Sequence, residues 1–148
     1  LNNLNSDGEL NPLMCACDIE NEEIVKLLIK NGASVDTENN DGDTPLILAC
    51  KNESISMVKI LIEFGADINK GNIDGDTPLL FACSSENSEI INYLINQGAD
   101  INKENSYGDI PLFIGCRNEN IDITETLIKN GADVNKENKY GETALIIS

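Results

Sequence analysis

Apolar and polar residues follow a pattern along the chain that returns every 33 residues. Within residues 41–73, positions 46–50 form an unbroken apolar stretch, and Ile55, Val58 and Leu61 then recur at the spacing of one helix face. The pattern predicts two short helices in each unit. The helix pair of a single unit cannot bury its own apolar stripe, so the units must stack.

The period is also marked by recurring prolines and by a recurring Gly-Ala-Asp. These stand at Pro12, Pro45, Pro78 and Pro111, and begin at Gly65, Gly98 and Gly131. A fixed period of this length is typical of solenoids. We expect a single array over 1–148, in which 7–40, 41–73, 74–106 and 107–139 are repeats, 1–6 is the tail of a preceding repeat and 140–148 begins a further one. Both termini would then lie within repeats, as expected for a piece of a longer array.

Local signals predict where the elements of a unit begin and end. The sequence Asp41-Gly42-Asp43 predicts a tight turn. Thr44-Pro45 reads as a helix cap followed by the first helical position, and Ser54 is placed to cap the second helix. Gly65 stands where that helix needs a left-handed residue to end. In the other units the predicted cap of the second helix is Asn21, Asn87 or Asn120.

These features together resemble an ankyrin repeat: Asp41-Gly42-Asp43-Thr44-Pro45-Leu46, then Val58 to Glu63, then Gly65-Ala66-Asp67-Ile68-Asn69. The resemblance covers essentially the whole chain. It implies an all-α solenoid of stacked helix-turn-helix units with protruding β-hairpin or loop arms.

Two positions depart from the family pattern. The histidine that usually follows Pro-Leu is replaced by an apolar residue in every unit, namely Met14, Ile47, Leu80, Phe113 and Ile146. The glycine between the two helices is replaced by Glu20, Glu53, Glu86 and Glu119. A left-handed Glu costs on the order of 1 kcal/mol, so the turn either bears this cost or is reshaped.

Composition limits the function classes. The net charge of −16 disfavours nucleic acids and anionic membranes and favours a basic partner surface. No stretch approaches the roughly 20 apolar residues that cross a bilayer. The chain has no histidine, no nucleophile motif and no glycine-rich phosphate loop, so we expect no catalysis and no cofactor.

Cysteines at the repeat period raise the question of a metal site. Equivalent positions in stacked units lie roughly 8 to 10 Å apart, too far for a shared zinc or a disulfide. We therefore interpret them as packing residues, with no bound metal, and expect Cys15 to face elsewhere. Five free thiols suit a reducing, cytoplasmic location. The periodic cysteines are Cys17, Cys50, Cys83 and Cys116.

The ankyrin resemblance implies a concave groove lined by arm tips and first helices, where partners bind. Carried over by position, the candidate residues are Asn40, Asp41, Asp43, Lys51, Asn52, Ile73, Asp74, Asp76, Ser84, Ser85, Ser106, Tyr107, Asp109, Arg117, Asn118, Lys139, Tyr140 and Glu142. The acidic members Asp43, Asp76, Asp109 and Glu142, joined by Glu9, predict an acidic column. Beside it, Ile73, Tyr107 and Tyr140 are predicted anchors.

The sequence thus predicts a non-catalytic module that binds a protein or peptide with a basic patch. Three alternatives stay open: a regulatory or targeting segment of a larger enzyme or channel, a structural spacer, and, for the acidic column, simple solvation. We expect a monomer, with end-to-end association of the apolar ends as the alternative. The resemblance also implies that Asn69, Asn102 and Asn135 match a hydroxylated position of some members, against a structural role in the turn.

Overall fold

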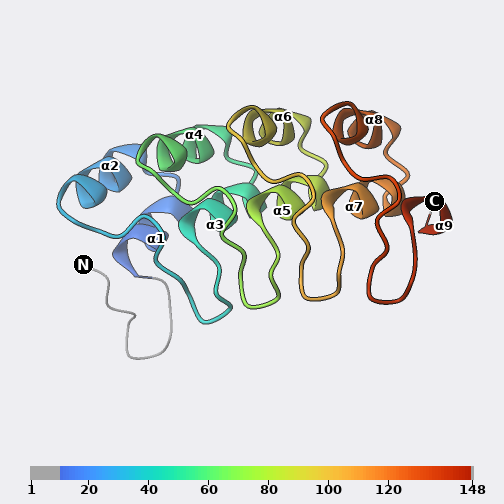
Figure 1. Cartoon of the computed structure of the whole chain (residues 1–148). Helices are drawn as coiled ribbons and strands as arrows, with labels where there is room; N and C mark the ends of the chain where they lie inside the picture. Colours follow the sequence, from blue (N-terminus) through green and yellow to red (C-terminus); the bar gives the residue numbers. More distant parts are fainter. Residues whose placement is uncertain (1–10, 148) are drawn as a thin grey trace.

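The computed structural model describes residues 11–147, so the expectations for Glu9 and for the segment 1–6 lie outside the described residues. Its helices stack in two rows, and arms project from the inner row (Figure 1). The inner row holds α1 (Pro12–Asp18), α3 (Pro45–Lys51), α5 (Pro78–Ser84), α7 (Pro111–Arg117) and the short α9 (Ala144–Ile147). The outer row holds α2 (Glu22–Lys30), α4 (Ile55–Glu63), α6 (Ser88–Asn96) and α8 (Ile121–Lys129). The all-α fold is confirmed.

Two inner helices, α3 and α5, begin as the Thr-Pro signal predicts. Thr44 precedes α3 in an extended conformation, and its hydroxyl oxygen accepts the Ile47 N–H at 3.2 Å. Proline follows as the first helical residue, where its missing N–H has no intrahelical partner to lose. Helix α1 is capped by Asn11 instead, whereas Ile110 occupies the cap position of α7 and contributes no side-chain bond.

The turn between the two helices of a unit keeps a left-handed residue although glycine is absent. Glu53 has φ +56°, and Glu20, Glu86 and Glu119 are within two degrees of it. Of the two alternatives, the chain therefore bears the left-handed cost of about 1–2 kcal/mol at each turn. At the far end of α4, Gly65 has φ +87°, as predicted, and the Ala66 N–H donates to the Leu61 carbonyl at 3.0 Å.

Caps of the outer helices also link one repeat to the next. The Asn87 side-chain oxygen accepts the Ile90 N–H at 3.1 Å, while its amide nitrogen donates to Glu53 of the preceding unit at 3.3 Å. The left-handed Glu thus gains a bond across the junction. The prediction for Ser54 was wrong in one respect: it occupies the cap position of α4, but its side chain makes no capping hydrogen bond.

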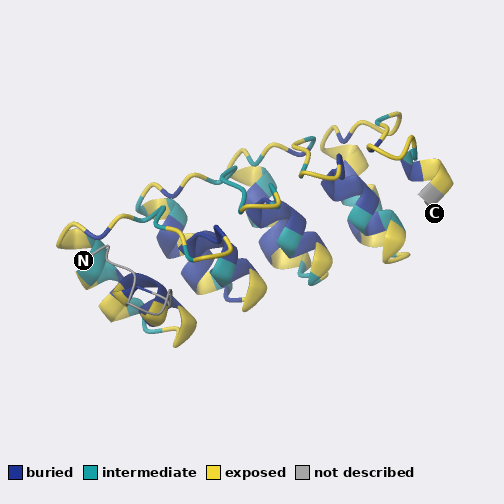
Figure 2. Cartoon of the chain, turned by 90° about the horizontal axis from the view of Figure 1, so that it is seen from below, coloured by how far each residue is buried: buried dark blue, intermediate teal, exposed yellow. Residues whose placement is uncertain are grey.

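Buried residues recur in every helix pair along the stack (Figure 2), and the apolar ones form one continuous cluster. Inner helices pack closely on their inner neighbours, whereas outer helices approach one another less closely. Four of the five apolar residues that replace the family histidine are buried, and the burial of each contributes roughly 1.5–3 kcal/mol. They are Met14, Ile47, Leu80 and Phe113, each at most 3% exposed, while Ile146 in α9 is 66% exposed.

The arms are loops, and within residues 11–147 no β-strand forms. Each arm is closed by a tight turn, in which the Gly42 N–H donates to the Asn39 carbonyl at 3.0 Å. Neighbouring arms are joined by a backbone bond, such as the one from the Ile73 N–H to the Asp41 carbonyl at 3.0 Å. A Cβ on Gly42 would lie 2.7 Å from the Ile73 nitrogen, which explains glycine at that close approach.

Candidate partner-binding face

The base of each arm is held by one asparagine that bonds in two directions. The Asn72 side-chain oxygen accepts the backbone N–H groups of Asp74 and Asp76 at 3.1 and 3.0 Å. Its amide nitrogen donates to Asp43 of the preceding arm at 3.0 Å. Asn105 repeats this arrangement one unit later, with its nitrogen 2.7 Å from Asp76. The asparagines therefore shape each arm and tie it to its neighbour.

Two acids of the predicted column are buried at the arm bases. Asp43 is 2% exposed and pairs with Lys51 at 2.5 Å, and Asp109 is 7% exposed and pairs with Arg117 at 2.5 Å. The hydrogen bond that Arg117 donates to Asp109 raises the pKa of Arg117. This differs from the expectation of a free acidic column, because both carboxylates are already neutralised by the chain's own cations.

The middle unit lacks such a cation. Ser84 stands in α5 where α3 has Lys51 and α7 has Arg117, and its hydroxyl donates to the Leu80 carbonyl at 3.1 Å. Asp76 is half-buried, and no lysine or arginine among residues 11–147 lies within ion-pair distance of it. The charge of Asp76 on this face is therefore not balanced by an ion pair.

A shallow depression of about 360 Å³ opens between two arms and the inner row. The Lys51 ammonium within it lies 4.5 Å from the centre of the Phe81 ring. Sequence reasoning did not select Phe81, although variation among Cys15, Leu48, Phe81 and Ile114 at equivalent positions could have indicated a surface position. The lining residues are Asp41, Lys51, Asn72, Ile73, Asp74, Asp76 and Phe81.

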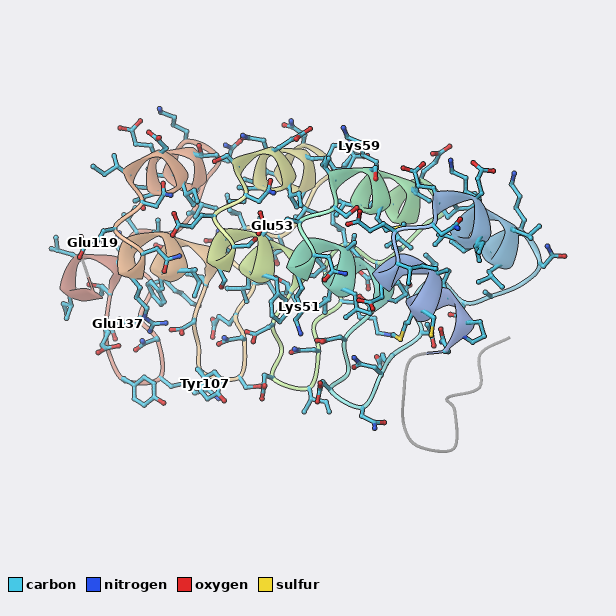
Figure 3. All side chains as sticks on the ribbon, turned by 180° about the vertical axis from the view of Figure 1, so that it is seen from behind. Lys51, Glu53, Lys59, Tyr107, Glu119 and Glu137 are labelled. Carbon is cyan, nitrogen blue, oxygen red and sulfur yellow. The ribbon has the colours of Figure 1, made fainter. Side chains whose placement is uncertain are left out.

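The predicted anchors lie at the arm tips and are exposed. Ile73 is 71% exposed, Tyr107 49% and Tyr140 72%. Tyr107 lies at the far end of its arm, away from the helix rows, while Lys51 lies on the inner row (Figure 3). We call the surface formed by these tips and by the exposed residues of α3, α5 and α7 the arm–helix face.

The other sequence candidates divide by exposure. Those that are exposed are Asn40, Asp41, Lys51, Asn52, Asp74, Ser84, Ser106, Arg117, Asn118 and Lys139. Ser85 and Glu142 are half-buried, and the Ser85 hydroxyl donates to the Phe81 carbonyl at 3.2 Å. Asn52 donates to Asp18 at the end of α1 at 3.3 Å and does not line the depression.

The periodic cysteines are packing residues, as predicted. Cys17, Cys50 and Cys83 are buried in the core, and burial raises the pKa of each thiol to about 12. Cys116 is half-buried, and Cys15 is exposed. Among residues 11–147, no group of three or more His, Cys, Asp or Glu side chains is arranged to hold a metal ion.

Two of the three asparagines at the hydroxylated position of some ankyrin repeats bond across a repeat junction. The Asn69 and Asn102 side-chain oxygens accept the N–H groups of Asp100 and Asp133, each at 2.8 Å. Asn135 is exposed, and its N–H donates to Asp133 at 2.9 Å. These bonds account for asparagine at two positions, while hydroxylation stays a prediction.

A family model described as ankyrin repeats in three copies matches residues 1–72 and 64–138. The chain belongs to the ankyrin repeat family. Ankyrin repeats are generally protein–protein interaction modules and are typically non-catalytic. A search of curated proteins gave no match to this chain. No helix within residues 11–147 has the length and apolarity needed to cross a bilayer.

Proposed function

We propose that this ankyrin array is a non-catalytic interaction module that binds a protein or peptide across the arm–helix face. The supporting observation is a contrast within three of the arms: the tips expose Ile73, Tyr107 and Tyr140, while the bases are fixed by bonds to neighbouring arms. Large side chains that are exposed on a fixed support gain contact area at a small cost in entropy.

Charge supports a basic partner. The sequence carries 26 acidic and 10 basic residues, and the uncompensated Asp76 lies close to the exposed arm-tip acids Asp41 and Asp74 in the depression. Attraction between opposite charges accelerates the encounter of two partners, and salt screens this attraction. Binding to this face should therefore weaken as ionic strength rises.

The test uses a displayed library of random 12-residue peptides, selected on the wild-type array. Replacing Tyr107 and Tyr140 together by Ala should weaken the selected peptides by about tenfold or more, because interface tyrosines often contribute over 1 kcal/mol each. Ile121→Ala is the matched control, since Ile121 is 72% exposed but lies on the outer helix α8.

Peptides that bind equally well to the wild type and to the double tyrosine variant would refute the use of the arm–helix face. A similar loss of affinity in the Ile121 variant would show that the tyrosine effect is not specific to that face.

A further inference from the structure

The array contains three equivalent arm-base acids followed by the end of an inner helix. At two of them the chain supplies a cation: Lys51 pairs with Asp43, and Arg117 pairs with Asp109. In each pair the cation follows the acid by eight residues. The third position holds Asp76, and the residue eight positions later is Ser84.

Ser84 cannot replace the missing cation. Its hydroxyl donates to the Leu80 carbonyl of its own helix, and its side chain carries no charge. Asp76 receives the Asn105 amide at 2.7 Å on one carboxylate oxygen. A half-buried carboxylate has lost part of its hydration, so a cation placed beside it gains more than it would in open solvent.

The residues around Asp76 indicate what kind of side chain would carry such a cation. The depression that Asp76 helps to line also contains Asp41 and Asp74, with Ile73 and Phe81 as its apolar walls. Lys51, the lysine of this depression, is already bonded to Asp43 and lies over the Phe81 ring. A side chain with a long apolar stem and a positive end matches both kinds of lining.

We propose that the position left without a cation beside Asp76 is a subsite for a lysine or arginine of a peptide that binds the arm–helix face. The inference rests on the proposed function and adds one specific requirement to it. The chain itself provides the precedent, because the equivalent carboxylates Asp43 and Asp109 bind one cation of each type. An apolar residue next to the basic one in the peptide would contact Ile73 and Phe81.

The test is a substitution that supplies the cation from the array itself. Ser84→Lys places an ammonium where Lys51 and Arg117 stand in the neighbouring units, so it should pair with Asp76 and exclude the peptide's cation. Peptides selected from the random library on the wild type should lose at least tenfold in affinity for this variant. Asn92→Lys, at an exposed position of the outer helix α6, changes the net charge equally and should lose less than twofold.

A second comparison changes the peptide. Replacing its basic residue by Gln should lower affinity for the wild type at least tenfold and leave affinity for Ser84→Lys nearly unchanged. Asp76→Asn should behave as Ser84→Lys does if the carboxylate is the contact. Circular dichroism establishes that each variant retains the helical fold.

The outcomes separate the two proposals. Peptides that depend on Tyr107 and Tyr140 but bind wild type and Ser84→Lys equally would overturn the subsite and leave the proposed function standing. Selected peptides with no basic residue would overturn it in the same way. Peptides that bind independently of both tyrosines would contradict the proposed function and the subsite together.

Discussion

The base and the tip of each arm lie only a few residues apart, but their side chains have different surroundings. At the base, Asn105 and Asp109 bond to neighbouring arms or to an inner helix, and Asp109 is 7% exposed. At the tip, Tyr107 is 49% exposed, and its backbone N–H donates to Asn105. The residues that set the arm's shape are thus distinct from those that face outward.

Residue types follow the same division. Every base has an asparagine, at Asn39, Asn72, Asn105 and Asn138, and an acid four positions later. The tips read Asn-Asp, Ile-Asp, Ser-Tyr and Lys-Tyr. Since the bonds of the base require one donor and one acceptor in fixed places, the base tolerates few residue types. The tip has no such requirement, so its chemistry can differ between units while the stack is retained.

The largest effect should come from crowding the contact between two arms. Gly42 and Gly141 both have φ +75°, but a Cβ on Gly42 would lie 2.7 Å from the Ile73 nitrogen, and one on Gly141 has nothing within 4 Å. Replacing Gly42 by Ala should lower the free energy of unfolding by about 3 kcal/mol, and Gly141→Ala by about 1 kcal/mol, the left-handed cost alone. Urea unfolding measures both.

The difference between these two variants isolates the contact between arms from the backbone strain that they share. Equal losses of stability would mean that adjacent arms are not tightly coupled, and the comparison of base and tip would lose its basis.

A smaller loss is expected at the base itself. Asn105→Ala removes the acceptor for the Tyr107 and Asp109 N–H groups and the donor to Asp76, which should cost about 2 kcal/mol in unfolding free energy. Asn105→Asp keeps the acceptor but sets a second carboxylate against Asp76. If the bond from Asn105 to Asp76 contributes to stability, Asn105→Asp will lower the free energy of unfolding at pH 7. An unchanged free energy of unfolding would mean that Asn105 stabilises only the turn of its own arm.

The smallest change should come from the tip. Tyr107→Ala should alter the free energy of unfolding by less than about 0.5 kcal/mol, because Tyr107 is 49% exposed and bonds to the arm base through its backbone N–H, which alanine retains. Thermal or urea unfolding checks this value. A loss above 1 kcal/mol would show that the tip also supports the fold, and any loss of peptide binding would then need correction for stability.

Much of the fold could be predicted from the sequence because its signals are local. Pro45 begins a helix, Gly65 ends one, and Leu46 and Ile47 belong to a stretch that a single unit cannot bury. The conformation of Glu53 could not be predicted, since the left-handed cost is offset by a bond to Asn87 in the next unit. That partner is 34 residues away, and its distance depends on how the units stack.

The candidate face was predicted less well, because its contacts also depend on how the units stack. Tyr107 and Tyr140 were recognised from their place in the unit, and both are exposed. Asp43 was assigned to an acidic surface, although it is buried beneath Lys51. Its burial follows from the packing of two arms against an inner helix. Residue type and spacing contain no direct measure of that packing.

The serine at position 84 has a consequence for how a partner would be aligned. A repeating array presents nearly the same backbone every 33 residues, so an extended ligand could shift by one unit and meet equivalent surroundings. The units that contain Lys51 and Arg117 both have a cation at this position, whereas the middle unit has Ser84. The translational symmetry of the solenoid is broken at that unit, so a chain bound as we propose would have one preferred frame along the array.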